Sequence, residues 1–76
     1  MSANLYWRPA DTKQNSLPDA LRMTLRDKRG FSGGEMRLTE ADTQYFQGLC
    51  DAGVHGAQDV MDAIGDHGSI VLWLEY

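Results

Sequence analysis

Residues 69–76, Ser-Ile-Val-Leu-Trp-Leu-Glu-Tyr, are the strongest β-strand signal in the sequence, and the fold prediction starts from them. Side chains alternate between the two faces of a strand. One face here carries aliphatic side chains and Tyr76, and the other carries Val71, Trp73 and Glu75. Because both faces are mostly apolar, we expect either a central strand or a strand with one face buried in a partner.

Three helices are predicted upstream of this strand. Apolar residues recur at helical spacing over residues 16–29, 39–52 and 56–67. The first helix is predicted to begin at Ser16, which precedes Asp19 by three positions as in a capping box. The second and third helices are joined by only a few residues, so we expect them to form a helical hairpin.

Two shorter strands complete the prediction, at residues 4–8 and 35–38, with a polar loop over residues 9–16. The order β-α-β-α-α-β predicts an α+β fold, in which a small, mainly antiparallel sheet of two or three strands carries three helices on one face. The first and last strands are expected to be neighbours. A length of 76 residues allows a single domain, spanning residues 1–76, with one small core.

Charged residues are unevenly distributed along the chain. All seven lysines and arginines lie in residues 1–38 together with four acidic residues, so this half has a formal charge of +3. Residues 39–76 hold the other seven acidic residues, for a formal charge of −7. This split provides either two charged surfaces for partners or one internal match between the halves.

Several sequence features predict a cytoplasmic protein without a membrane contact. The only cysteine, Cys50, has no second thiol with which to form an internal disulfide, which suits a reducing compartment. The N-terminal residues lack the basic cluster and apolar run of a signal peptide. No apolar stretch approaches the roughly 20 residues that a membrane span needs.

Three aspartates form an acidic stripe on the third predicted helix. Asp59, Asp62 and Asp66 are spaced by three and four positions, so they share one helix face and repel one another. Three explanations stay open: arginines of the first helix approach this face, a basic partner binds it, or it only confers solubility. A straight helix points such carboxylates apart, so neither a metal site nor a cofactor is expected.

The C-terminal strand carries the second candidate surface. The chain has seven aromatic residues, many for so small a core. If helices cover only one face of the sheet, the other face forms an exposed patch, made either by Trp73, Val71 and Tyr6 or by the side chains on the opposite faces of the same strands. Tryptophan and tyrosine are favoured at interfaces. A second small core is the alternative interpretation. We predict a protein-binding surface for a basic partner, formed by Asp59, Asp62, Asp66, Trp73 and Tyr76.

A basic stripe on the first predicted helix suggests another type of partner. Arg22, Arg26 and Arg29 share one helix face and suffice for a weak contact with a nucleic-acid backbone. Asp19 and Asp27 interrupt the stripe, and no base-reading motif accompanies it. Nucleic acid is therefore the second candidate. Self-association is the third, through an edge strand or as a homodimer through the aromatic strand.

No residue pattern in the sequence indicates catalysis. Cys50 has no basic group close in sequence that would activate its thiol. The glycine-rich residues 30–34 lack the Lys-Ser/Thr ending of a phosphate-binding loop. Chains of this size rarely enclose a pocket for a small molecule. We therefore assign no catalytic residue and do not expect an enzyme.

Residues 38–76 combine a Leu-Thr start, an Asp-Ala-Gly-Val helix end, an acid-rich helix, a His-Gly pair and a tryptophan-containing strand. In this combination the chain resembles small proteins encoded by bacteriophages and prophages. The resemblance implies a small accessory protein that acts by binding, often as a modulator or inhibitor of a protein in the cytoplasm of the bacterial host. It carries no residue roles with it.

Overall fold

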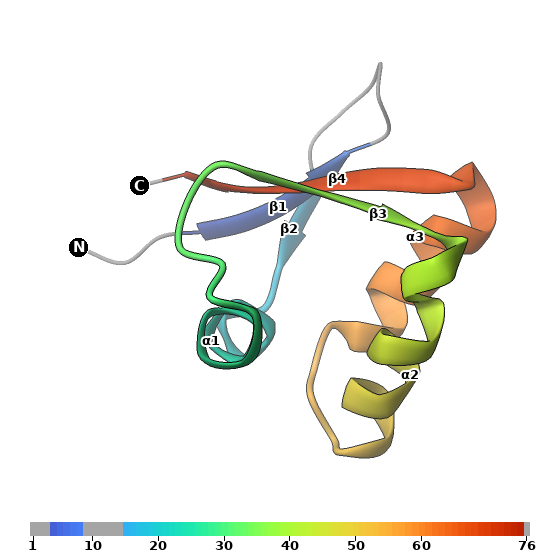
Figure 1. Ribbon diagram of the computed structural model, residues 1–76, viewed down its shortest axis with the longest axis horizontal. Coiled ribbons are helices and arrows are strands. Elements are labelled where there is room, and N and C mark those ends of the chain that lie inside the picture. Colours follow the sequence, from blue (N-terminus) through green and yellow to red (C-terminus); the bar gives the residue numbers. More distant parts are fainter. Residues whose placement is uncertain (1–3, 9–14, 76) are drawn as a thin grey trace.

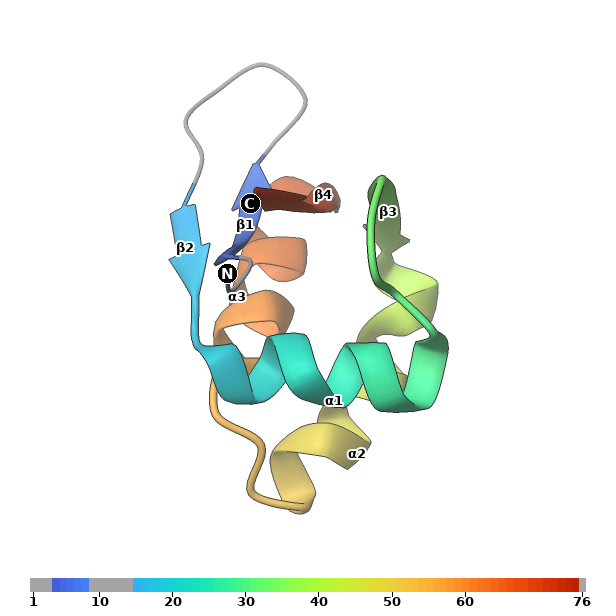
Figure 2. The same ribbon diagram turned by 90° about the vertical axis from the view of Figure 1, so that its left-hand side faces the viewer.

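The fold is a four-stranded antiparallel sheet with helices beneath one of its faces (Figures 1 and 2). The computed structural model describes residues 4–8 and 15–75. In chain order the elements are β1 (Asn4–Arg8), β2 (Asn15–Leu17), α1 (Asp19–Arg29), β3 (Glu35–Thr39), the short 3-10 helix η1 (Glu40–Asp42), α2 (Thr43–Asp51), α3 (Ala57–His67) and β4 (Ser69–Glu75). The predicted α+β fold is confirmed, with one strand more than expected.

β4 is a central strand, as its apolar composition predicts. The strand order is β2-β1-β4-β3, so β4 pairs with β1 on one side and with β3 on the other. In this register Leu72 lies between Trp7 and Met36. The prediction that the first and last strands are neighbours in the sheet is confirmed, because β1 pairs with β4.

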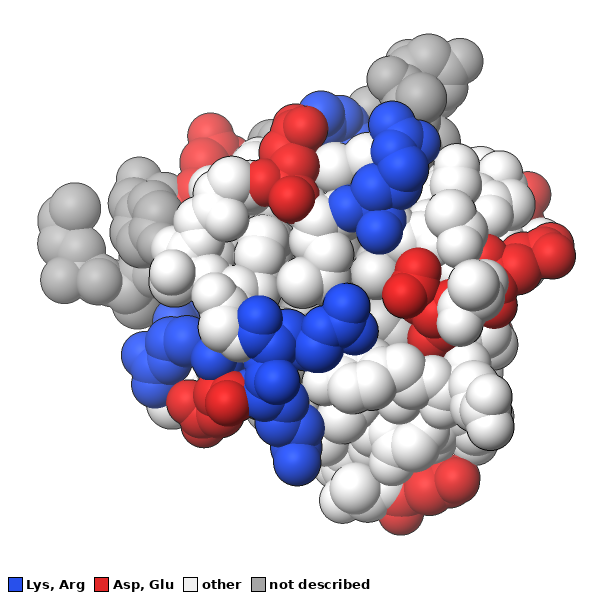
Figure 3. All heavy atoms as spheres, in the orientation of Figure 1, with Lys and Arg blue, Asp and Glu red and all other residues white. Residues whose placement is uncertain are grey.

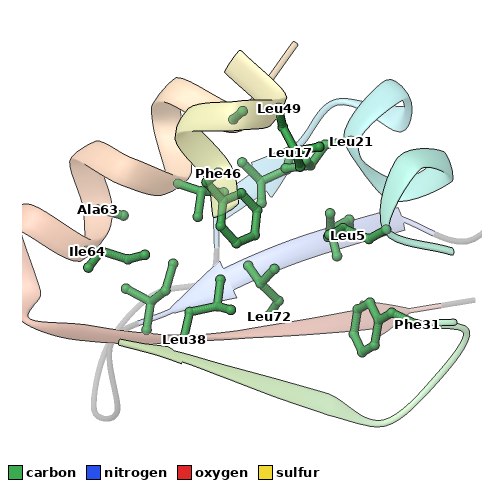
Figure 4. Close-up of a cluster of buried hydrophobic side chains, with 14 residues drawn as sticks. Leu5, Leu17, Leu21, Phe31, Leu38, Phe46, Leu49, Ala63, Ile64 and Leu72 are labelled. Atoms are coloured by element: carbon green, nitrogen blue, oxygen red, sulfur yellow. The ribbon is translucent and has the colours of Figure 1, made fainter. Parts of the chain in front are cut away.

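The core lies between the sheet and the helices (Figure 4). Leu5, Leu38 and Leu72 point into it from three strands, and each is fully buried. Phe46 of α2 and Ile64 of α3 meet them from the helical layer, with at most 1% of either residue exposed. Burial of each such side chain stabilises the fold by roughly 1.5–3 kcal/mol. Since strand side chains alternate, the neighbours of these leucines point to the other face of the sheet.

The prediction that Ser16 begins the first helix is wrong. Ser16 and Leu17 lie in β2, where they pair with Tyr6 and Leu5 of β1. Pro18 disfavours a helical conformation of the residue before it and is itself extended, with φ −60° and ψ 149°. The helix therefore begins only after the proline, at Asp19. Leu17 still reaches the core, but from a strand.

The predicted start of the second helix at Thr39 is confirmed. The backbone N–H of Thr39 donates to Oδ2 of Asp42 at 2.8 Å, and the Thr39 hydroxyl oxygen accepts from the backbone N–H of Ala41. These contacts belong to a capping box that begins η1, and α2 follows directly. None of the helices in the described part of the chain is both long and apolar enough to cross a lipid bilayer.

The starts of α1 and α3 lie close together at Gly56. This residue has φ +95°, a conformation that side chains other than glycine rarely adopt. A β-carbon built at Gly56 would lie 2.8 Å from Cδ of Pro18. The missing side chain therefore allows α3 to begin directly against the proline that precedes α1.

Candidate functional site on the open face of the sheet

No element of the described part of the chain covers the sheet face that points away from the helices (Figure 1). The strand register places two rows of three side chains at the centre of this face, with the pair Asn4 and Glu75 beyond them at one end and the pair Ser69 and Thr39 at the other. We call this surface the open sheet face, with one row formed by Tyr6, Trp73 and Glu35 and the other by Arg8, Val71 and Arg37.

Two aromatic rings stack at the centre of the open sheet face. Tyr6 of β1 and Trp73 of β4 are register partners, and their ring centroids lie 5.5 Å apart at an interplanar angle of 29°. Both residues are half-buried. Such a pair contributes about 0.5–1.5 kcal/mol beyond its buried area. The contact holds the indole in one orientation while leaving part of it accessible.

Arg8 links three strands across this pair. Its guanidinium carbon lies 4.5 Å from the centroid of the Trp73 ring, within the range of a cation–π contact. Its Nη2 donates to Oε2 of Glu35 at 2.7 Å. Because β4 lies between β1 and β3, the arginine reaches Glu35 by crossing the indole of Trp73. The side chains of Arg8 and Glu35 are 31% and 59% exposed, so solvent limits this ion pair to about 1 kcal/mol or less.

The second row of the open sheet face provides a cation without an acidic partner. Val71 is only 6% exposed although it lies on this face. Its register partners are Arg8 and Arg37, whose side chains lie next to it on the same face. Arg37 is exposed and makes no ion pair with any described residue. It can therefore meet an acidic group of a partner.

The predicted acidic stripe lies on a different side of the molecule. Asp59, Asp62 and Asp66 are exposed on α3, whose opposite face is buried in the core. Asp62 accepts a hydrogen bond from Nε2 of Gln58 at 2.9 Å, and none of the three aspartates forms an ion pair within the described residues. The structure therefore does not bring these aspartates together with Trp73. Tyr76 lies outside the described residues.

The arginines of α1 do not neutralise the acidic stripe. Arg22 pairs with Asp19 at 3.5 Å and Arg26 with Asp27 at 3.6 Å, both within α1. The guanidinium carbon of Arg29 lies 4.8 Å from the ring centroid of Tyr45 on α2. In every ion pair between described residues, both partners thus lie within residues 1–38. One of the three explanations of the acidic stripe, that α1 approaches it, finds no support in these contacts.

The remaining reactive side chains have ordinary structural surroundings. Cys50 is half-buried, and its Sγ donates to Oε1 of Gln58 at 3.7 Å. Among residues 4–8 and 15–75, no group of three histidine, cysteine or acidic side chains is placed to hold a metal ion. The absence of catalysis stays a prediction.

Sequence reasoning grouped Trp73 with Tyr6 and Val71 in one exposed patch but missed the charged residues Arg8, Glu35 and Arg37 beside them. Tyr6 and Arg8 share one face of a predicted strand, and Glu35 and Arg37 share one face of another. Alternation alone could have grouped each pair, but strand order and register bring them to Trp73. Comparisons with protein-family models, curated proteins and solved structures found no match.

Proposed function

We propose that this protein is a non-enzymatic module that binds another protein through its open sheet face. The supporting observation is the position of Trp73, which contacts Tyr6 and Arg8 on a sheet face that no described element covers. Tryptophan, tyrosine and arginine are the residues most enriched among binding hot spots. Because neighbouring side chains already hold the indole, binding costs less conformational entropy.

The row with Arg8 and Arg37 favours a partner with an acidic group at that position, and the aromatic pair favours apolar groups, although Glu35 and Glu75 also lie on this face. Arg8 and Arg37 lie in one row, and only Arg8 has an acidic partner, Glu35. The sequence alone favoured a basic partner because of the aspartates of α3. That surface is separate from the open sheet face, and whether it binds a basic partner stays a prediction. A modulator or inhibitor that acts on a protein of a bacterial cytoplasm would fit both the phage resemblance and this proposal.

Single-stranded nucleic acid is the second candidate partner. Aromatic rings beside arginines on an antiparallel sheet form stacking platforms for bases in several nucleic-acid-binding folds. The Tyr6–Trp73 pair with Arg8 above the indole favours this candidate. It ranks second because the net charge of the chain is −4 and the arginines of α1 already have neighbours within the protein. Nucleic-acid binding of this type would weaken steeply with salt.

A capture experiment with matched variants tests the proposal. The tagged protein is incubated with nuclease-treated lysate of the source or host cell, in parallel with Trp73→Ala, Arg8→Gln and Met23→Ala. Met23 is the matched control because it is an exposed apolar residue, 43% accessible, on α1. Circular dichroism confirms that each variant is folded.

We expect the wild type and Met23→Ala to retain the same protein, Arg8→Gln to retain less, and Trp73→Ala to lose it. A hot-spot truncation typically weakens binding by about 2 kcal/mol, or roughly thirtyfold. Equal retention by Trp73→Ala and the wild type would contradict the proposal. Retention only before nuclease treatment would support the second candidate.

A further inference from the structure

β3 is an edge strand whose outer side has no partner in the described part of the chain. It pairs with β4 over its full length, from Glu35 opposite Trp73 to Thr39 opposite Ser69. Figure 2 shows β3 at the border of the sheet with no ribbon beyond it. The free backbone groups of an edge strand are a template for a further strand. β3 has five residues and no proline, so it can accept one.

Charges on the molecular surface around β3 alternate in sign. Figure 3 looks onto the outer side of β3 and shows basic side chains gathered at the lower left, over the end of α1, with acidic side chains on the right; in the upper part of the view the order is reversed, with acidic side chains on the left and basic side chains further right. The last turn of α1 carries Arg26, Lys28 and Arg29, and η1, which follows β3, carries Glu40 and Asp42. On the helix side of β3 the charge therefore changes from basic at one end of the strand to acidic at the other, whereas within β3 itself the acidic Glu35 precedes the basic Arg37.

We infer that β3 of a second copy of this chain pairs antiparallel with β3 at the edge of the sheet. A twofold axis relates the two copies and passes between their Met36 residues. A half-turn about an axis perpendicular to the sheet places the acidic end of one copy against the basic end of the other. This match places basic groups near Glu40 and Asp42, which form no ion pair with the described residues of their own chain. The contact is the same on both copies, so it closes as a dimer.

Cross-strand pairs select the register of this dimer. With Met36 opposite its counterpart, Glu35 of each copy lies opposite Arg37 of the other, and opposite charges at such positions stabilise a sheet. Arg37 makes no ion pair in the described part of the single chain, so it is available for this contact. A register centred on Arg37 would place two arginines opposite each other, which is destabilising. The half-buried Met36 side chains would meet on the core side of the sheet.

The opposite border of the sheet is less suited to such a contact. β2 has only three residues, so it offers fewer backbone groups than β3. In a dimer through β3 the sheets of the two copies would be continuous, and both open sheet faces would lie on the same side. The dimer would then present two copies of the aromatic surface together.

Complementary charge reversals test the inference by sedimentation equilibrium. We expect the wild type to dimerise reversibly with rising concentration. Arg37→Glu and Glu35→Arg should each raise the dissociation constant about tenfold or more, because each homodimer then sets like charges opposite each other at both positions. An equimolar mixture of the two variants should dimerise again, because each glutamate then faces an arginine. Asp59→Lys, a charge reversal on α3, is the control and should dimerise like the wild type.

Hydrogen exchange of the wild-type protein tests the same inference without any substitution, so it applies even if a variant does not fold. Amide hydrogen exchange of the wild type should slow at β3 as the protein concentration rises, since the outer backbone groups of this strand form hydrogen bonds only in the dimer. A wild type that stays monomeric up to its solubility limit would overturn the inference. A mixture of two folded variants that is no more dimeric than either variant alone would also overturn it.

Discussion

The open sheet face and the acidic stripe of α3 differ in how their side chains are held. On the sheet, residues from three strands contact one another through a ring stack, a cation–π contact and an ion pair. On α3, three carboxylates point outward, and among the described residues their one side-chain contact is the hydrogen bond that Gln58 donates to Asp62. Both surfaces stand out in the sequence, but only the sheet face is organised before any partner arrives.

This difference separates two uses of exposed side chains. A cluster that is fixed by its own contacts presents a shaped surface and contributes to short-range recognition. A row of exposed charges without such contacts contributes mainly to solubility and to long-range attraction. We therefore expect substitutions on the sheet to affect both stability and binding, and substitutions on the outer face of α3 to affect stability only slightly.

The largest effect is expected for Trp73→Ala. The variant loses the stack with Tyr6, the cation–π contact with Arg8 and the buried part of the indole surface. Its free energy of unfolding should fall by about 2 kcal/mol, as measured by urea denaturation. Met23→Ala, at an exposed position of α1, should change it by less than about 0.5 kcal/mol. Equal effects of the two substitutions would show that the aromatic cluster is not organised as described.

A smaller effect is expected for the ion pair that crosses the indole. In a double-mutant cycle with Arg8→Gln and Glu35→Gln, the coupling energy should be about 0.5 kcal/mol and should decrease with added salt. Denaturation of the four proteins at low and high salt measures it. A coupling energy of zero at low salt would indicate that the contact between Arg8 and Glu35 does not persist in solution.

The smallest effect is expected on α3. Asp66 lies near the negative end of the helix dipole and Asp59 near the positive end, within the first turn. Asp66→Asn should therefore be more stable than Asp59→Asn by about 0.5 kcal/mol at neutral pH. Thermal unfolding of the two variants at low ionic strength measures this difference. The reverse order would mean that Asp59 and Asp66 have stronger contacts than the helix dipole.

Local sequence signals predicted most of the fold. The alternation in residues 69–76 predicted β4, and the spacing of apolar residues predicted α3. Ser16 was misassigned because the proline two positions later overrides its capping pattern. β2 has three residues, too few to show alternation, and it pairs with residues of β1 that lie 8 to 12 positions earlier in the sequence.

The candidate site was less predictable than the fold. Alternation along β4 placed Trp73 opposite the aliphatic stripe, which the structure confirms. Arg8 and Glu35 are 27 positions apart, and no local pattern indicates that they meet over the indole. Their contact follows from the strand order, which is a property of the whole sheet. For the same reason the sequence could not show that Trp73 and the aspartates of α3 lie on different sides.

The most direct test of the central claim is a nuclear magnetic resonance titration of the labelled protein with the protein that it captures. Our account predicts that amide chemical shifts change in residues 4–8, 35–39 and 69–75, with little change in residues 57–67. Trp73→Ala should abolish these changes, whereas the double variant Asp59→Lys with Asp62→Lys should leave them in place. Shift changes confined to α3 and lost in the double variant would contradict the account and assign binding to the acidic stripe.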